Sequence, residues 1–173
     1  MLGANYAAGI ELTGTVNIRN STYWLIQKDG SRIRLNGATQ QITGALRQLR
    51  NQDYLIASGV LRTDLMLVHE IQFVGLKRIL GWWIAADGSA VEIKDFNHIY
   101  WHQMDKKTKQ LAPAYKIDYA LAPYERQHWS LFMVRQGRPL TGRLKATAKK
   151  LDMEFWSSEK PHEPINLKRM AHK

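Results

Sequence analysis

The sequence predicts a mainly β protein in two parts: a five-stranded barrel with one helix, followed by a second β-rich sandwich or barrel. Three observations predict this fold class. Apolar and polar residues alternate with a period of two over most segments, which is typical of half-buried strands. Asp29-Gly30 and Asp87-Gly88 each lie between two apolar-rich runs, as the turn of a β-hairpin does. A helical period appears early in the chain, over Thr39–Asn51.

The first part begins after a loose lead-in over residues 1–9. Ile10–Arg19 alternates cleanly and is a predicted strand, in which Gly14 marks a bulge or a barrel bend. His69 has the parity of its apolar neighbours, so we expect it in the core or at its rim. The other expected elements are strands at Tyr23–Lys28 and Ser31–Leu35, the helix at Thr39–Asn51, and strands at Tyr54–Leu61 and Leu65–Val74.

This order of elements, three strands, a helix and two strands, resembles the OB-fold over residues 10–75. The resemblance rests on Gly14 in the first strand, the Asp29-Gly30 hairpin, the one helix, and Ala57-Ser58-Gly59-Val60-Leu61 in the fourth strand. It implies a Greek-key barrel that binds ligands on the face of strands two and three and on adjoining loops. Another five-stranded barrel or roll is the alternative.

Residues 76–80 form a predicted connector, and residues 81–173 form the second, β-rich part. Seven or eight short strands at regular spacing favour a small sandwich or barrel. Gly81-Trp82-Trp83 resembles the Gly-x-Trp that opens lipocalin-like barrels, and this resemblance implies that Arg169 caps a tryptophan. The segment is short for that family. The expected strands are Trp82–Ala86, Ser89–Asp95, Asn97–Gln103, Tyr115–Leu121, His128–Arg135, Thr141–Ala148, Leu151–Trp156 and Ile165–Met170.

Charge is the main compositional signal, because the chain carries a net +10 at pH 7. Both parts contribute, so the charge does not come from one basic tail. It favours acidic macromolecules, anionic glycans or nucleic acid as partners, with a basic surface that serves only solubility as the alternative. No apolar run approaches the ~20 residues of a membrane helix.

The absence of cysteine excludes disulfides, cysteine-bound zinc and thiol catalysis. It weakly favours an exported protein of the periplasm or cell envelope, with a leader that the given chain lacks. No catalytic, phosphate-binding or dinucleotide motif occurs in the sequence. His98 and His102 lie four residues apart on a predicted strand, about 13 Å at a rise of ~3.3 Å per residue, which is too far to share a metal ion. We therefore expect no enzyme activity, cofactor or metal. A hydrolase whose two catalytic carboxylates lie far apart in the sequence is the less favoured alternative.

A basic, aromatic surface on the first hairpin is the best candidate for binding. Ile33 and Leu35 face the core by alternation, so their arginine neighbours must face outward. An exposed aromatic ring beside arginines suits stacking on bases or sugars with contacts to anionic groups. The alternative is that this face packs against the second part of the chain. The candidate residues are Trp24, Lys28, Arg32 and Arg34, with Arg19 and Arg62 from flanking loops.

Trp156 is a further candidate, because it is out of phase with the apolar residues of its strand and should face outward. Taken together, these features predict a non-catalytic binding or interaction module for a protein, a peptide or an anionic glycan. The alternative is a single-stranded nucleic-acid-binding protein.

Overall fold

The computed structural model describes residues 9–124, 128–135, 137–156 and 164–170. The predicted mainly β class is confirmed, and the described residues contain one α-helix. The chain divides into two compact units, residues 1–75 and residues 76–173. No helix in the described ranges has the length and apolar character needed to cross a membrane.

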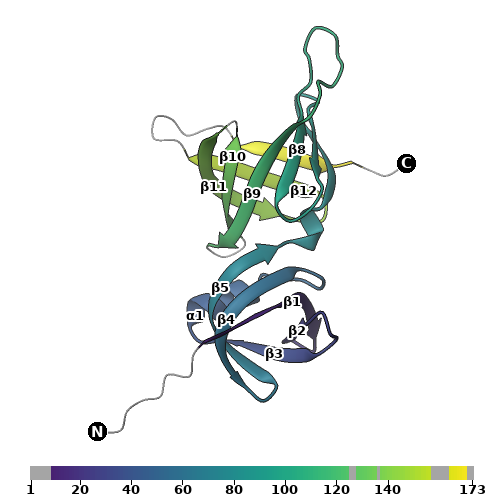
Figure 1. Ribbon diagram of the computed structural model, residues 1–173. Coiled ribbons are helices and arrows are strands. Elements are labelled where there is room, and N and C mark those ends of the chain that lie inside the picture. Colours follow the sequence, from purple (N-terminus) through teal and green to yellow (C-terminus); the bar gives the residue numbers. More distant parts are fainter. Residues whose placement is uncertain (1–8, 125–127, 136, 157–163, 171–173) are drawn as a thin grey trace. The chain divides into compact units, whose positions relative to one another are not determined.

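The N-terminal unit is a closed five-stranded barrel (Figure 1). Its elements are β1 (Ile10–Arg19), β2 (Thr22–Ile26), β3 (Arg32–Gly37), α1 (Gln40–Leu46), β4 (Tyr54–Arg62) and β5 (Leu65–Gly75). The order of the strands around the barrel is β1-β2-β3-β5-β4, and β4 pairs with β1 to close it. Neighbouring strands are antiparallel except β3 and β5, which are parallel.

β1 pairs with both of its neighbours in this barrel, β4 and β2, and it changes partner next to Gly14. The first half of the strand pairs with β4 up to Thr15, and the second half pairs with β2 from Thr15 onward. A Cβ atom at Gly14 would lie 2.3 Å from the carbonyl oxygen of Ile26, closer than real Cβ contacts come. Glycine therefore lets β1 approach β2 closely, next to the residue where its pairing changes from β4 to β2.

The helix is shorter than predicted. It begins after Thr39, whose hydroxyl accepts a hydrogen bond from the Ile42 N–H at 3.2 Å, but it ends at Leu46 instead of Asn51. Beyond Arg47 the next backbone bonds reach only three residues back, as in Leu49 N–H to Leu46 C=O at 3.1 Å. This tighter turn buries Leu49 without continuing the helix. The helical spacing of apolar residues in the sequence therefore extends beyond the helix itself.

The predicted core or rim position of His69 is wrong, because this residue is exposed. The pairing of β4 with β5 shifts register twice, between Ser58 and Gly59 and between Ile56 and Ala57. Each shift leaves one residue of β5 unpaired, and His69 is the first of them. A β-bulge changes which parity faces the core, so alternation along the sequence assigns the wrong side from that point.

The C-terminal unit is a closed barrel of eight antiparallel strands, which decides between the predicted sandwich and barrel (Figure 1). Each strand pairs with the next along the chain, and β13 pairs with β6 to close the ring. The strands are β6 (Gly81–Ala85), β7 (Ala90–Ile93), β8 (His98–His102), β9 (Tyr115–Pro123), β10 (Trp129–Arg135), β11 (Arg138–Ala146), β12 (Lys150–Trp156) and β13 (Ile165–Arg169). A 3₁₀ turn, η1 (Lys77–Ile79), precedes β6 and occupies the predicted connector.

Arg169 and Trp83 close one end of this barrel. The buried Trp83 ring donates its indole N–H to the Ile79 carbonyl of η1 at 2.7 Å. The Arg169 guanidinium lies 4.4 Å from the centre of the Trp83 ring and donates to the backbone carbonyls of Arg78, Leu80 (3.1 Å) and Ala148 (3.0 Å). The expectation that Arg169 caps a tryptophan is therefore confirmed.

Gly81 makes room for this arrangement. Its φ of +113° lies in a region that residues with a side chain rarely adopt. A Cβ atom there would lie 3.3 Å from Nη1 of Arg169. Both the backbone conformation and the packing of Arg169 therefore favour glycine at position 81.

Asp95 organises the turn between β7 and β8 at the same end. Its Oδ1 accepts the N–H groups of Asn97 and His98, each at 2.8 Å, and its Oδ2 lies 2.7 Å from Nδ1 of His98. Tyr119 donates its hydroxyl to the Asp95 carbonyl at 3.0 Å. Burial acts to raise the pKa of the Asp95 carboxyl, but the hydrogen bonds from His98 and Asn97 outweigh it and hold that pKa below its ordinary value of 3.8.

We expect Arg169→Gln to lower the free energy of unfolding of the C-terminal unit by about 3 kcal/mol, because it removes the cation–π contact and charge-assisted bonds to three carbonyls. Chemical denaturation followed by tryptophan fluorescence measures this, since five of the six tryptophans belong to this unit. Lys168→Gln, an exposed position on the same strand, is the control. Equal effects of the two substitutions would contradict the closure role of Arg169.

We expect Asp95→Ala to cost about 0.5–1 kcal/mol at pH 7, because the turn is partly solvent-exposed. A carboxyl whose pKa is lower in the folded state stabilises the fold at pH values above its unfolded-state pKa. This contribution is lost as the pH falls through the folded-state pKa. The difference from the unsubstituted chain should therefore shrink below pH 4. Urea denaturation at pH 7, 5 and 3 checks this, and Asp95→Asn, which keeps an acceptor oxygen, isolates the part due to charge.

Candidate functional site

Five of the predicted site residues come together on the outer surface of the N-terminal barrel. Pairing across β1, β2 and β3 places Asn17, Trp24 and Arg34 side by side. The same row continues from Arg34 through Leu65 of β5 to Arg62 of β4. Arg32 and Arg19 lie two residues along β3 and β1 from this row. We call this surface the basic face; its predicted members are Arg19, Trp24, Arg32, Arg34 and Arg62.

The orientation of these side chains follows the sequence-based expectation. Ile33 and Leu35 of β3 are buried, with 9% and 2% of their surface exposed, and Arg32 and Arg34 between and beside them are exposed. Trp24 is half-buried on the same side. Alternation along β3 thus fixes which way each arginine points.

A shallow hollow lies beside Trp24. Its volume is about 300 Å³, and it is lined by Asn17, Arg19, Asn20, Thr22, Trp24 and Arg32. The turn at Asn20 and Ser21, with φ of 47° and 60°, joins β1 to β2 at its edge. Among the described residues, no carboxylate forms an ion pair with any arginine of the basic face. The hollow therefore offers an aromatic ring flanked by cations that attract anionic groups.

The other two predicted residues lie elsewhere. Lys28 is exposed in the turn between β2 and β3, beyond the paired rows. Trp156 belongs to the C-terminal unit, where it ends β12 with 42% of its surface exposed, as its phase predicts. Its ring lies 5.9 Å from that of Tyr124 on the outside of the barrel.

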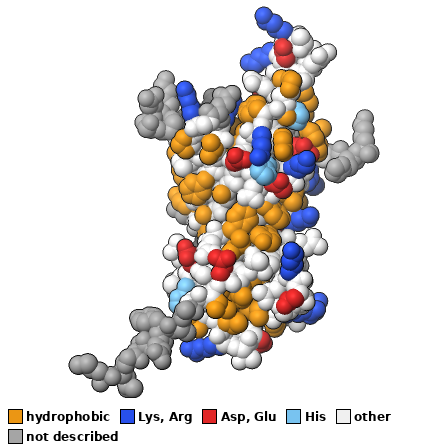
Figure 2. Space-filling model, in the orientation of Figure 1, with side chains coloured by type: hydrophobic (Ala, Val, Ile, Leu, Met, Phe, Trp, Pro, Cys, Tyr) orange, Lys and Arg blue, Asp and Glu red, His pale blue; other side chains and the backbone are white. Residues whose placement is uncertain are grey.

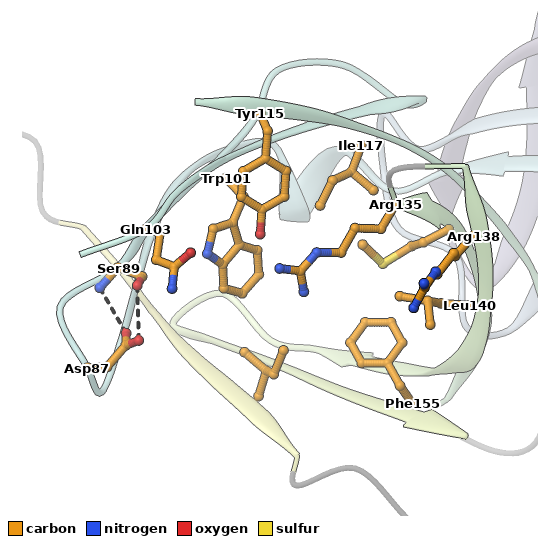
Figure 3. Close-up of a pocket in the computed structure, with 12 residues that line it drawn as sticks. Asp87, Ser89, Trp101, Gln103, Tyr115, Ile117, Arg135, Arg138, Leu140 and Phe155 are labelled. Carbon is orange, nitrogen blue, oxygen red and sulfur yellow. Dashed lines mark hydrogen bonds between the residues drawn. The ribbon is translucent and has the colours of Figure 1, made fainter. Parts of the chain in front are cut away.

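The C-terminal barrel contains a larger cavity that opens at the end opposite to Arg169. Because successive strands alternate in direction, the ends of β6, β8, β10 and β12 and the starts of β7, β9, β11 and β13 all lie at that end. The cavity, which we call the cup, has a volume of about 640 Å³ (Figure 3). It is lined by the apolar residues Trp101, Ile117, Met133, Leu140, Phe155 and Ile165 and by the polar residues Asp87, Ser89, Gln103, Tyr115, Arg135 and Arg138.

Two arginines stand at the mouth of the cup. Arg135 ends β10, Arg138 begins β11, and the two residues are cross-strand partners. The Arg135 guanidinium lies 5.2 Å from the centre of the Tyr115 ring. Burial raises the pKa of the Tyr115 hydroxyl, and Arg135 offsets only part of this rise. Tyr115 is therefore a neutral hydrogen-bond donor at physiological pH.

Asp87 and Ser89 on the facing wall bond to each other. The Asp87 carboxylate accepts the Ser89 N–H at 2.9 Å and the Ser89 hydroxyl at 3.0 Å (Figure 3). The Ser89 oxygen in turn accepts the Met104 N–H at 3.0 Å. These bonds hold the β6–β7 turn against the start of the β8–β9 loop, so Asp87 and Ser89 have a structural role at the rim.

Sequence reasoning did not find the cup. Its apolar lining residues lie on the inward parity of their strands, as core residues do, so alternation gives no sign of an unfilled barrel end. Arg135 and Arg138 could have indicated it, because they share the parity of the inward-facing residues on their strands and a charged side chain is not expected in a filled core. In the described ranges, no three or more His, Asp or Glu side chains are grouped to hold a metal ion.

Comparisons of this chain with protein-family models, with curated proteins and with solved structures found no match.

Proposed function

We propose that this chain is a non-catalytic binding protein and that its cup takes a small, largely apolar molecule. One observation carries this proposal: a cavity of about 640 Å³ that opens at one end of a closed barrel, while at the other end Arg169 packs on the buried ring of Trp83. Small-molecule sites usually measure about 300–1,000 Å³ and combine apolar walls with a few polar groups. Six apolar and six polar side chains line the cup in this way.

The folds support the same reading. The order β1-β2-β3-β5-β4, with β3 parallel to β5 and α1 between β3 and β4, supports an OB-like Greek-key domain over residues 10–75. The eight-stranded up-and-down barrel, with Gly81-Trp82-Trp83 at its start and Arg169 at its end, supports a lipocalin-like domain over residues 81–173. Both are fold types in which sites are built on or in the barrel.

A second candidate function belongs to the basic face. The unpaired arginines around Trp24 support binding of an acidic partner, of which an anionic glycan or an acidic protein or peptide is our first choice. Single-stranded nucleic acid is the alternative, because its bases stack on aromatic rings and its phosphates attract arginine. The two ligands differ in their salt dependence, which for nucleic acid follows the number of phosphates neutralised.

We expect Leu140→Trp, which fills the cup, to weaken binding of the uncharged dye N-phenyl-1-naphthylamine by about tenfold or more, or ~1.4 kcal/mol. Val134→Trp is the matched control, since it adds the same ring on the exposed outer side of the neighbouring strand. Dye fluorescence titrated with the full chain measures both variants. Absence of dye binding, or equal binding by the two variants, would contradict the cup as a site.

For the basic face, we expect the triple variant Trp24→Ala, Arg32→Ala, Arg34→Ala to lose about tenfold or more in affinity for a sulfated oligosaccharide. Its melting temperature should fall only by the amount that the loss of the half-buried Trp24 ring causes, because both arginine side chains are exposed. Trp24→Ala alone measures that amount. Titrations at several salt concentrations, with a mixed-sequence DNA oligonucleotide in parallel, distinguish the two ligand classes. A large loss of stability without loss of binding would show that the face is structural.

A further inference from the structure

The mouth of the cup is chemically asymmetric. The walls deeper in the barrel are apolar, with Ile117, Met133 and Leu140 among them. Arg135 and Arg138 stand together on one side of the opening. Figure 3 shows the Arg135 side chain extending across the mouth toward Trp101 and Tyr115, and the Arg138 side chain beside Leu140 and Phe155. A molecule seated in the cup would therefore meet hydrocarbon along its body and two guanidinium groups at one end.

Neither guanidinium is neutralised by its surroundings. Within the described part of the chain, Arg135 and Arg138 form no ion pair with a carboxylate. Asp87 is the one acidic residue that lines the cup, and both of its oxygens already accept bonds from Ser89. The two positive charges are thus available to an anion from outside the chain.

The loop from β8 to β9 adds positive charge at the same end of the barrel. This loop projects at the top of Figure 1, and Figure 2 shows Lys or Arg side chains at its tip. It holds Lys106, Lys107 and Lys109, all exposed, and Gln103 at its base lines the cup. Asp105, the one acidic residue of the loop, accepts the N–H groups of Lys107 and Thr108. The field around the opening therefore favours the approach of an anion.

Tyr115 completes a set of donors at the mouth. Its neutral hydroxyl and the Gln103 amide are hydrogen-bond donors, and each guanidinium offers paired N–H groups that match the two oxygens of a carboxylate. We infer that the ligand of the cup is an amphipathic anion with an apolar body inside the barrel and a carboxylate-type head group at Arg135 and Arg138. This inference rests on the proposed function, since it names the chemical class of molecule that the same cup takes.

The test compares two ligands that differ only in the head group, decanoate and 1-decanol, in displacing N-phenyl-1-naphthylamine from the full chain. We expect decanoate to displace the dye at an about tenfold lower concentration, as charge-assisted hydrogen bonds at a solvated mouth allow. The double variant Arg135→Gln, Arg138→Gln should lose this advantage and keep its affinity for decanol. Arg135→Lys, Arg138→Lys keeps the charge and should retain part of the advantage.

The control variant Lys116→Gln, Lys168→Gln removes two charges from the outside of the same barrel and should leave both ligands unchanged. The inference of an anionic head group is overturned if decanoate and decanol displace the dye equally, or if the two glutamine variants affect decanoate equally. In either case the cup remains a binding site. Failure of both ligands and of the dye to bind overturns the cup itself. Melting temperatures of all variants confirm that each one is folded.

Discussion

The contact of Arg169 with Trp83 is the interaction on which the C-terminal barrel depends. Eight strands form a closed ring only if the last strand meets the first, and β13 and β6 pair over just three residues. Arg169 reinforces this short seam by bonding to carbonyls before β6 and before β12 while it covers the indole ring. These bonds lie at one end of the barrel, and the cavity opens at the other end, beside Arg135 and Arg138.

The positive charge of the chain is divided among distinct tasks. Some arginines have a structural role. Arg169 packs on the Trp83 ring, and Arg143 of β11 forms an ion pair with Glu154 of β12 at 2.7 Å. Others have no acidic partner among the described residues and lie at or beside a concave surface. These are Arg135 and Arg138 at the cup, and Arg19, Arg32, Arg34 and Arg62 on the basic face. Part of the +10 net charge therefore lies on two separate surfaces whose arginines have no acidic partner among the described residues.

Local chemistry made much of the fold predictable. Gly30 and Gly88 have φ of 85° and 89°, as Asp-Gly turns require, and the hairpin at Gly30 fixes the register that aligns Trp24 with Arg34. His69 was misplaced because a bulge depends on the partner strand, which the sequence does not show. The cup was missed for a related reason: a wall residue such as Leu140 alternates as a core residue does, and only the closure of all eight strands decides whether the barrel end is filled.

A crystal structure of the full chain with 10-bromodecanoate tests the central claim most directly, because the anomalous signal of bromine locates the far end of the ligand. The account predicts a bromine peak inside the C-terminal barrel, among Ile117, Met133 and Phe155, with the carboxylate at Arg135 and Arg138. A bromine peak confined to the outer surface of the chain, with the cup holding only solvent, would contradict it.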